Sequence, residues 1–134
     1  MGNELENRMS NIVLVGKDLS AFGAFITELS RQKGVDVVEV ESGSELLAMV
    51  DSEKVDVVVL AEELGDGAAM SFASGLIKKQ PLINCAMMSN LDPKDFHEET
   101  EGLGIFMQLP ICPGAEEAVN LLKYLKSIDA LFSS

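Results

Sequence analysis

The stretch Val55-Asp56-Val57-Val58-Val59-Leu60-Ala61 decides the fold of this 134-residue chain. It is an apolar, largely β-branched run that contains one acidic residue, and the polar, glycine-containing segment 62–67 ends it. Such a run predicts a strand that is buried on both faces of a sheet. In α/β proteins, chemistry is usually placed at the carboxyl end of such a strand. Here that position carries Ala61, whose methyl side chain can neither donate, accept, bind a metal nor attack a substrate.

Four further apolar segments have the same character, and helical patterns separate them. The predicted strands are 11–15, 35–40, 55–60, 82–88 and 105–107. The predicted helices run from about 18 to 33, onward from the capping box at 42–45, and over 68–79, 93–101 and 114–132. The strands are too uniformly apolar to leave one face in water. The pattern therefore indicates a parallel sheet with helices on both sides and right-handed crossovers.

Length and composition indicate one domain, which we expect over 11–132, behind a disordered polar leader of residues 1–10. The net charge is −12. Such a surface repels phosphate backbones and anionic lipids, so we expect no binding to nucleic acid or membranes. No apolar stretch suits a membrane span or a signal peptide. Cys85 and Cys112 are too few for a metal cluster or a redox pair, and we expect a cytoplasmic protein.

The order and spacing of these segments resemble the receiver domain of two-component response regulators. The resemblance covers residues 11–131. It implies the flavodoxin-like fold, a three-layer, doubly wound α/β domain with a parallel five-stranded sheet in the order 2-1-3-4-5. It also implies an acidic pair that binds magnesium, an aspartate that accepts phosphate, a hydroxyl residue, a lysine before a proline, and a switch aromatic residue three positions before that lysine.

The first half of that chemistry is altered in this chain. The acidic pair falls on Gly16 and Lys17, which leaves Asp18 as the acid of that loop, and Ala61 takes the place of the phosphoacceptor. Phosphoryl transfer to a receiver needs a carboxylate nucleophile, and alanine has no nucleophilic atom. Magnesium prefers carboxylate oxygens, and the cation of Lys17 opposes its binding.

The second half is altered in part. The hydroxyl position matches Ser89 and the aromatic position is Phe106, but the lysine position is Leu109, followed by the retained Pro110. A leucine cannot neutralise a phosphoryl oxygen. We therefore expect a pseudo-receiver: no catalytic residue, no bound metal, no cofactor and no enzymatic activity.

Two acidic residues near the altered pocket leave alternatives open. Glu62 places a permanent carboxylate beside Ala61, although the strand pleat directs it to the other side. Asp66 is a candidate for an unusual phosphoacceptor, and Asp18, Glu62 and Asp66 together are a candidate for a metal site. Lys17 is either a replacement cation in the pocket or a solvated loop residue.

Two of the predicted helices are relevant to the binding of a protein partner. The helix at 93–101 has only Phe96 as a large apolar residue, so we expect it to be short or mobile. The last helix has an apolar arc wider than one sheet face needs, which favours a protein partner or a homodimer through this helix. The surface part of that arc is predicted to contain Leu121, Tyr124, Ile128, Leu131 and Phe132.

The sequence thus favours a non-catalytic signalling module that acts by protein–protein interaction without phosphorylation of aspartate. The face formed by the fourth helix, fifth strand and fifth helix is expected to carry the interaction. Two rivals remain at this point. One is a small-ligand domain that uses the crevice at the strand ends, where Gly16, Ala61 and Gly65 leave room. The other is an atypical phosphorylatable receiver.

Overall fold

The computed structural model describes residues 10–32, 34–52, 55–80, 83–103 and 105–133, with residues 10, 21, 52 and 126–133 described as backbone only. The expected leader lies outside the described residues except for Ser10, which begins the first strand. In the described part of the chain, no helix is long and apolar enough to cross a membrane.

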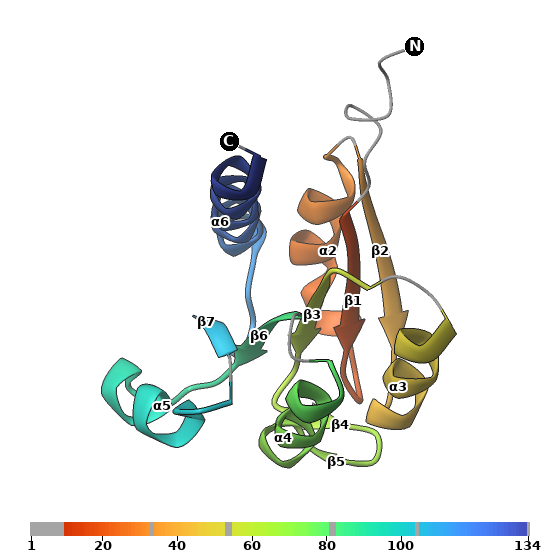
Figure 1. The fold of residues 1–134 in the computed structure, drawn as a ribbon, viewed down its shortest axis with the longest axis vertical. Coiled ribbons are helices and arrows are strands. Elements are labelled where there is room, and N and C mark those ends of the chain that lie inside the picture. Colours follow the sequence, from red (N-terminus) through yellow and green to blue (C-terminus); the bar gives the residue numbers. More distant parts are fainter. Residues whose placement is uncertain (1–9, 33, 53–54, 81–82, 104, 134) are drawn as a thin grey trace.

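A parallel sheet of five strands forms the centre of the molecule (Figure 1). In spatial order its strands are β2 (Val35–Val40), β1 (Ser10–Val15), β3 (Val57–Leu60), β6 (Asn84–Met88) and β7 (Ile105–Leu109). Each neighbouring pair is parallel. Counted along the chain without a small hairpin described below, this is the order 2-1-3-4-5, so the predicted flavodoxin-like fold is confirmed.

Helices cover both faces of the sheet (Figure 1). On one face lie α2 (Gly23–Ser30) and α6 (Ala115–Ser133), and on the other lie α3 (Gly43–Ser52), α4 (Ala69–Lys79) and α5 (Pro93–Thr100). Alternate residues of β3 supply two separate cores: Val57 and Val59 pack with α2 and α6, whereas Val58 and Leu60 pack with α3 and α4. All four are buried, which explains why the strand sequence is continuously apolar.

Local signals in the sequence place several of these elements. The capping box forms at the start of α3, where the Glu45 backbone N–H donates to Ser42 Oγ at 3.2 Å and the Ser42 N–H donates to Glu45 Oε1 at 3.2 Å. Gly34, which follows α2, has φ +84°, a left-handed conformation that glycine adopts without steric cost. The first helix is shorter than predicted, because the 3-10 helix η1 (Ser20–Phe22) precedes α2 and α2 ends at Ser30.

The segment after β3 is more ordered than the predicted loop. It forms an antiparallel hairpin of β4 (Glu63–Leu64) and β5 (Gly67–Ala68). The Lys17 N–H donates to the Glu63 carbonyl at 3.0 Å, and the Gly65 N–H donates to the Glu41 carbonyl at 2.6 Å. The hairpin is therefore bound to the ends of β1 and β2. Strands of two residues are too short for an alternating pattern, so the sequence carries no signal for them.

Candidate functional site: an altered receiver pocket and the face beside it

An apolar cluster occupies the carboxyl ends of β1, β3 and β7, where the receiver pocket is expected. We call Gly16, Leu19, Ala61 and Leu109 the apolar plug. A Cβ atom at Gly16 would lie 2.7 Å from Leu19 Cδ2 and 2.8 Å from Ala61 Cβ. Ala61 is 6% exposed and Leu109 is 2% exposed; both belong to one buried cluster, against which Leu19 packs. Leu19 thus fills the space that an acidic side chain at position 16 would need.

The room that the sequence predicted at the strand ends is accordingly absent. Gly16 and Ala61 are in close approach to each other, and a Cβ atom at Gly65 would lie 3.0 Å from the Glu41 carbonyl oxygen. That part of the small-ligand interpretation is wrong, because neighbouring atoms occupy the space that the small residues leave.

Two acids near the plug, Asp18 and Asp66, are held by other partners. Asp18 Oδ1 accepts hydrogen bonds from the Ser20 hydroxyl at 2.7 Å and the Ser20 N–H at 3.0 Å, and these bonds lower the pKa of Asp18. Lys17 is exposed, as expected of a solvated loop residue. Among the described residues, no three His, Cys, Asp or Glu side chains are placed to hold a metal ion.

Asp66 serves a structural role at the start of α3. Its Oδ1 accepts the Gly43 N–H at 2.8 Å, and its Oδ2 accepts the Ser44 hydroxyl at 2.9 Å and the Ser44 N–H at 3.1 Å. These hydrogen bonds lower the pKa of Asp66, that from Gly43 most. Both carboxylate oxygens are thus engaged at a helix N-terminus, a favourable place for a negative charge.

Ser89, at the hydroxyl position, is buried at the end of β6. Its Oγ accepts the Leu91 N–H at 3.1 Å, and its own N–H donates to the Leu109 carbonyl at 2.9 Å. Gln108 of β7 adds a contact that the sequence analysis missed. Its Nε2 donates to the Leu91 carbonyl at 2.8 Å and the Ser89 carbonyl at 3.3 Å. The only sequence signal is an amide side chain within an apolar strand.

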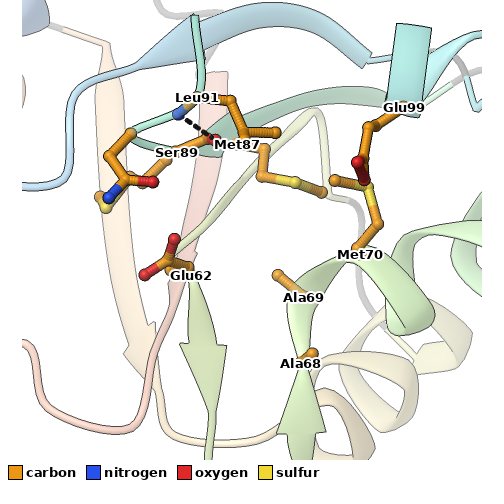
Figure 2. A pocket seen from close by; sticks show the side chains of 10 residues that line it. Glu62, Ala68, Ala69, Met70, Met87, Ser89, Leu91 and Glu99 are labelled. Carbon is orange, nitrogen blue, oxygen red and sulfur yellow. Dashed lines mark hydrogen bonds between the residues drawn. The ribbon is translucent and has the colours of Figure 1, made fainter. Parts of the chain in front are cut away.

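A small cavity opens beside Ser89, between β6 and the first turn of α4, with α5 on its far side (Figure 2). Its volume is about 250 Å³. Apolar and methionine side chains make most of its wall, with two glutamates among them; the lining residues are Glu62, Ala68, Ala69, Met70, Met87, Met88, Ser89, Asn90, Leu91 and Glu99. Glu62 and Ala61 thus face different sites, as the strand pleat predicted.

Phe106 lies at an irregularity of the edge strand β7. Cys85 pairs with Ile105 and Ala86 pairs with Met107, which leaves Phe106 as an extra residue in the register. Phe106 and Met107 consequently pack against the same core cluster although they are adjacent in sequence. The Phe106 ring stacks on Tyr124 of α6, with centroids 4.6 Å apart and an interplanar angle of 10°.

The predicted interface residues of α6 divide into separate groups. Tyr124 is 38% exposed. Leu121 is completely buried between α6 and the sheet, so its prediction as a surface residue is wrong. The side chains of Ile128 and Leu131 lie outside the described residues. We call Phe106, Tyr124 and the exposed acids Glu98, Glu99 and Glu101 the α5–β7–α6 face.

Comparisons with known proteins agree on the fold. Neither a protein-family model nor a curated protein sequence matches this chain. Among solved structures, it is similar to the signal receiver domain of an HD domain-containing protein from Pseudomonas fluorescens, with a TM-score of 0.74 and 16% identity over 87% of this chain and 86% of that one. It is equally similar to a chemotaxis response regulator of Vibrio cholerae, with a TM-score of 0.74 and 16% identity over 87% of this chain and 98% of that one.

A third similar structure is a two-component response regulator from Clostridium difficile, with a TM-score of 0.71 and 17% identity over 94% of this chain and 100% of that one. The structure therefore has the fold of response-regulator receiver domains, as the order of its segments predicted. At these identities the likeness concerns the fold, and function must be argued from the residues.

Proposed function

We propose that this chain is a receiver-like signalling module of a two-component or phosphorelay pathway that binds a protein partner and is not switched by phosphorylation of aspartate. The apolar plug is the observation that carries this proposal. Gly16, Ala61 and Leu109 replace a metal ligand, the nucleophile and the phosphate-binding lysine, and Leu19 fills the remaining space. A site without a nucleophile or a charge-neutralising group cannot catalyse phosphoryl transfer.

The engagement of Asp66 supports the same proposal against the rival of an atypical phosphoacceptor. Each oxygen of Asp66 accepts a hydrogen bond at the start of α3, Oδ1 from Gly43 and Oδ2 from Ser44, so a phosphoryl group on either oxygen would displace a bond that holds this helix end. Asp18 is likewise engaged by Ser20. Neither acid is a free carboxylate next to a cation site.

The experiment that tests the proposal is incubation with acetyl phosphate and magnesium, followed by intact mass measurement. We expect no added mass, whereas a receiver domain with an intact acidic pocket, treated in the same tube, gains roughly 80 Da for one phosphoryl group. A stoichiometric adduct on this chain would refute the proposal, and loss of the adduct in Asp66→Asn would identify the acceptor.

The α5–β7–α6 face is the surface we assign to the partner. It combines an exposed aromatic ring, Tyr124, with β7, which is the edge strand of the sheet formed by the described residues. Glu98, Glu99 and Glu101 give the face an acidic rim. Two copies would bring like charges together, so a partner with basic residues around an apolar centre suits the face better than a homodimer.

Sedimentation analysis of the purified protein separates these two cases. We expect a monomer at micromolar concentration and a complex with the partner that weakens as salt rises from 0.05 to about 0.5 M, because exposed charge pairs are screened over this range. A concentration-dependent dimer that Tyr124→Glu abolishes would assign the face to self-association instead.

A further inference from the structure

We propose that the cavity beside Ser89 binds a small organic cation, an ammonium or guanidinium group on a short apolar body, and that its occupancy is transmitted to the α5–β7–α6 face. The ligand site stands on the geometry of the cavity alone. The transmission rests on the proposed function of that face.

The size and lining of the cavity define the body of the ligand. A volume of about 250 Å³ is smaller than the sites that hold drug-sized molecules. At about 30 Å³ for each water-sized group, it accepts roughly eight non-hydrogen atoms. Ala69, Met70 and Met87 contribute apolar surface, and methionine side chains adapt to the shape of what they contact. The body of the ligand is therefore apolar and short.

The charges around the cavity define the head group. Glu62 from the end of β3 and Glu99 from α5 lie on opposite sides of the opening (Figure 2). None of the described residues that line the cavity is a lysine, arginine or histidine. The first turn of α4 also lies here, without a side-chain cap. The N-terminus of a helix acts as about half a positive charge and therefore favours an anion. Two full carboxylates outweigh that half charge, so a cation is preferred.

A chain of contacts joins the cavity to the partner face. Ser89 and Leu91 line the cavity, and the Gln108 side chain holds the carbonyl oxygens of both. Two positions earlier in β7, Phe106 stacks on Tyr124. A ligand that shifts the loop after β6 therefore acts on β7 directly through Gln108, and through β7 on the aromatic pair.

The ligand site is tested by titrating the isotope-labelled protein with butylamine and butylguanidine, with 1-pentanol as the neutral control of similar size. We expect amide shifts centred on 62, 68–70 and 87–91, and binding of the cations about two- to fivefold tighter than that of the alcohol, since an exposed charge pair contributes about 0.2–1 kcal/mol. No shifts at tens of millimolar, or equal binding of the alcohol, would overturn the site.

Matched variants locate the head group. Glu99→Gln is expected to weaken binding about two- to fivefold, whereas Glu98→Gln, an exposed neighbour on the same helix that does not line the cavity, leaves it unchanged. Equal effects of the two variants would show only the general acidity of the protein and refute the site. A blocked lysine, Nα-acetyl-lysine methylamide, identifies the source: binding at the same residues indicates a partner's side chain, and exclusion indicates a free amine.

Tyr124 reports the transmission, because the chain contains one tyrosine and no tryptophan. We expect cation binding to shift the Tyr124 ring resonances and tyrosine fluorescence in the wild type, and Gln108→Ala to remove that response. Shifts at the cavity with a silent Tyr124 would refute the transmission and leave the ligand site intact. Neither result depends on the acetyl phosphate experiment, so failure of this inference and failure of the proposed function are distinguishable.

Discussion

Replacing Gly16 by alanine tests whether the space at the carboxyl ends of the strands is closed. The structure places the new methyl carbon 2.7 Å from Leu19 Cδ2 and 2.8 Å from Ala61 Cβ, both far inside ordinary contact distance. Leu19 can rotate away at its far end, but Ala61 Cβ is fixed to the backbone of β3 and can move only with it. Gly16 is not among the glycines with positive φ in the described chain, so an alanine there has no backbone strain of its own.

The expected loss of stability follows from two opposing effects. Overpacking of a well-packed core destabilises by about 1–3 kcal/mol. Replacing glycine by alanine stabilises by about 0.4–1 kcal/mol, because the unfolded chain loses conformational freedom. We therefore expect Gly16→Ala to lower the free energy of unfolding by about 1–2 kcal/mol. Gly23→Ala is the matched control, because a Cβ atom there meets nothing within 4 Å. It should raise the free energy of unfolding by about 0.4–1 kcal/mol.

Urea denaturation followed by circular dichroism measures both changes. With m-values of about 1–3 kcal/mol/M, the midpoints of the two variants should differ by roughly 1 M urea. The double variant Gly16→Ala/Ala61→Gly should recover part of the loss, because one of the two opposed methyl groups is gone. If Gly16→Ala matches Gly23→Ala in stability, the space at the strand ends is open and the argument for a closed pocket fails.

Four further predictions concern other parts of the molecule. Asp66→Ala should lower the free energy of unfolding at pH 7. This loss should shrink as the pH falls from 3.8 through the lowered pKa of Asp66, because the carboxylate stabilises the fold only while it is ionised; urea midpoints measured against pH test this. Gln108→Ala should lower the free energy of unfolding by about 1–2 kcal/mol in the same assay and speed amide exchange in residues 89–91, because two carbonyl groups lose their hydrogen-bond donor. Of the two cysteines, only exposed Cys112 should react with a thiol reagent at pH 8 until urea is added, because burial raises the pKa of Cys85 to about 12. A double-mutant cycle of Phe106→Leu with Tyr124→Leu should give a coupling energy of about 0.5–1.5 kcal/mol, and a value near zero would mean that the stacked pair does not hold in solution.

Much of the fold follows from local and periodic signals. The continuously apolar β3 predicts burial on both faces, and two separate cores meet at that strand. The capping box at Ser42 and Glu45 and the left-handed Gly34 also act within a few residues, so the sequence shows them directly. The strand order was predicted from the family resemblance. That resemblance rested on the order and spacing of the alternating strands and helices.

The site was harder to predict, because its contacts join distant segments. The altered positions are visible in the sequence, but whether the space they leave is open depends on Leu19, which reaches over from the loop after β1. Gln108 was missed because its partners, Ser89 and Leu91, follow a different strand. Leu121 was misplaced because the periodicity of a helix does not show how much of its apolar arc the rest of the fold buries. Tertiary packing decides each of these cases.

The plug also explains why the departures from receiver chemistry belong together. A carboxylate at position 61 would stand at a site where alanine is 6% exposed, within the buried apolar cluster that includes Leu109 and against which Leu19 packs. Burying an unpaired charge costs several kcal/mol, so the group would instead raise its pKa and protonate. A neutral carboxyl is a poor nucleophile, and no metal ligand at Gly16 or cation at Leu109 would assist it. Restoring any one position is therefore unfavourable while the other positions are apolar, and each apolar residue stabilises its neighbours. The strand ends consequently form a stable structural unit. In our proposals, the response of this domain to its surroundings depends instead on the cavity beside Ser89 and the face that carries Tyr124.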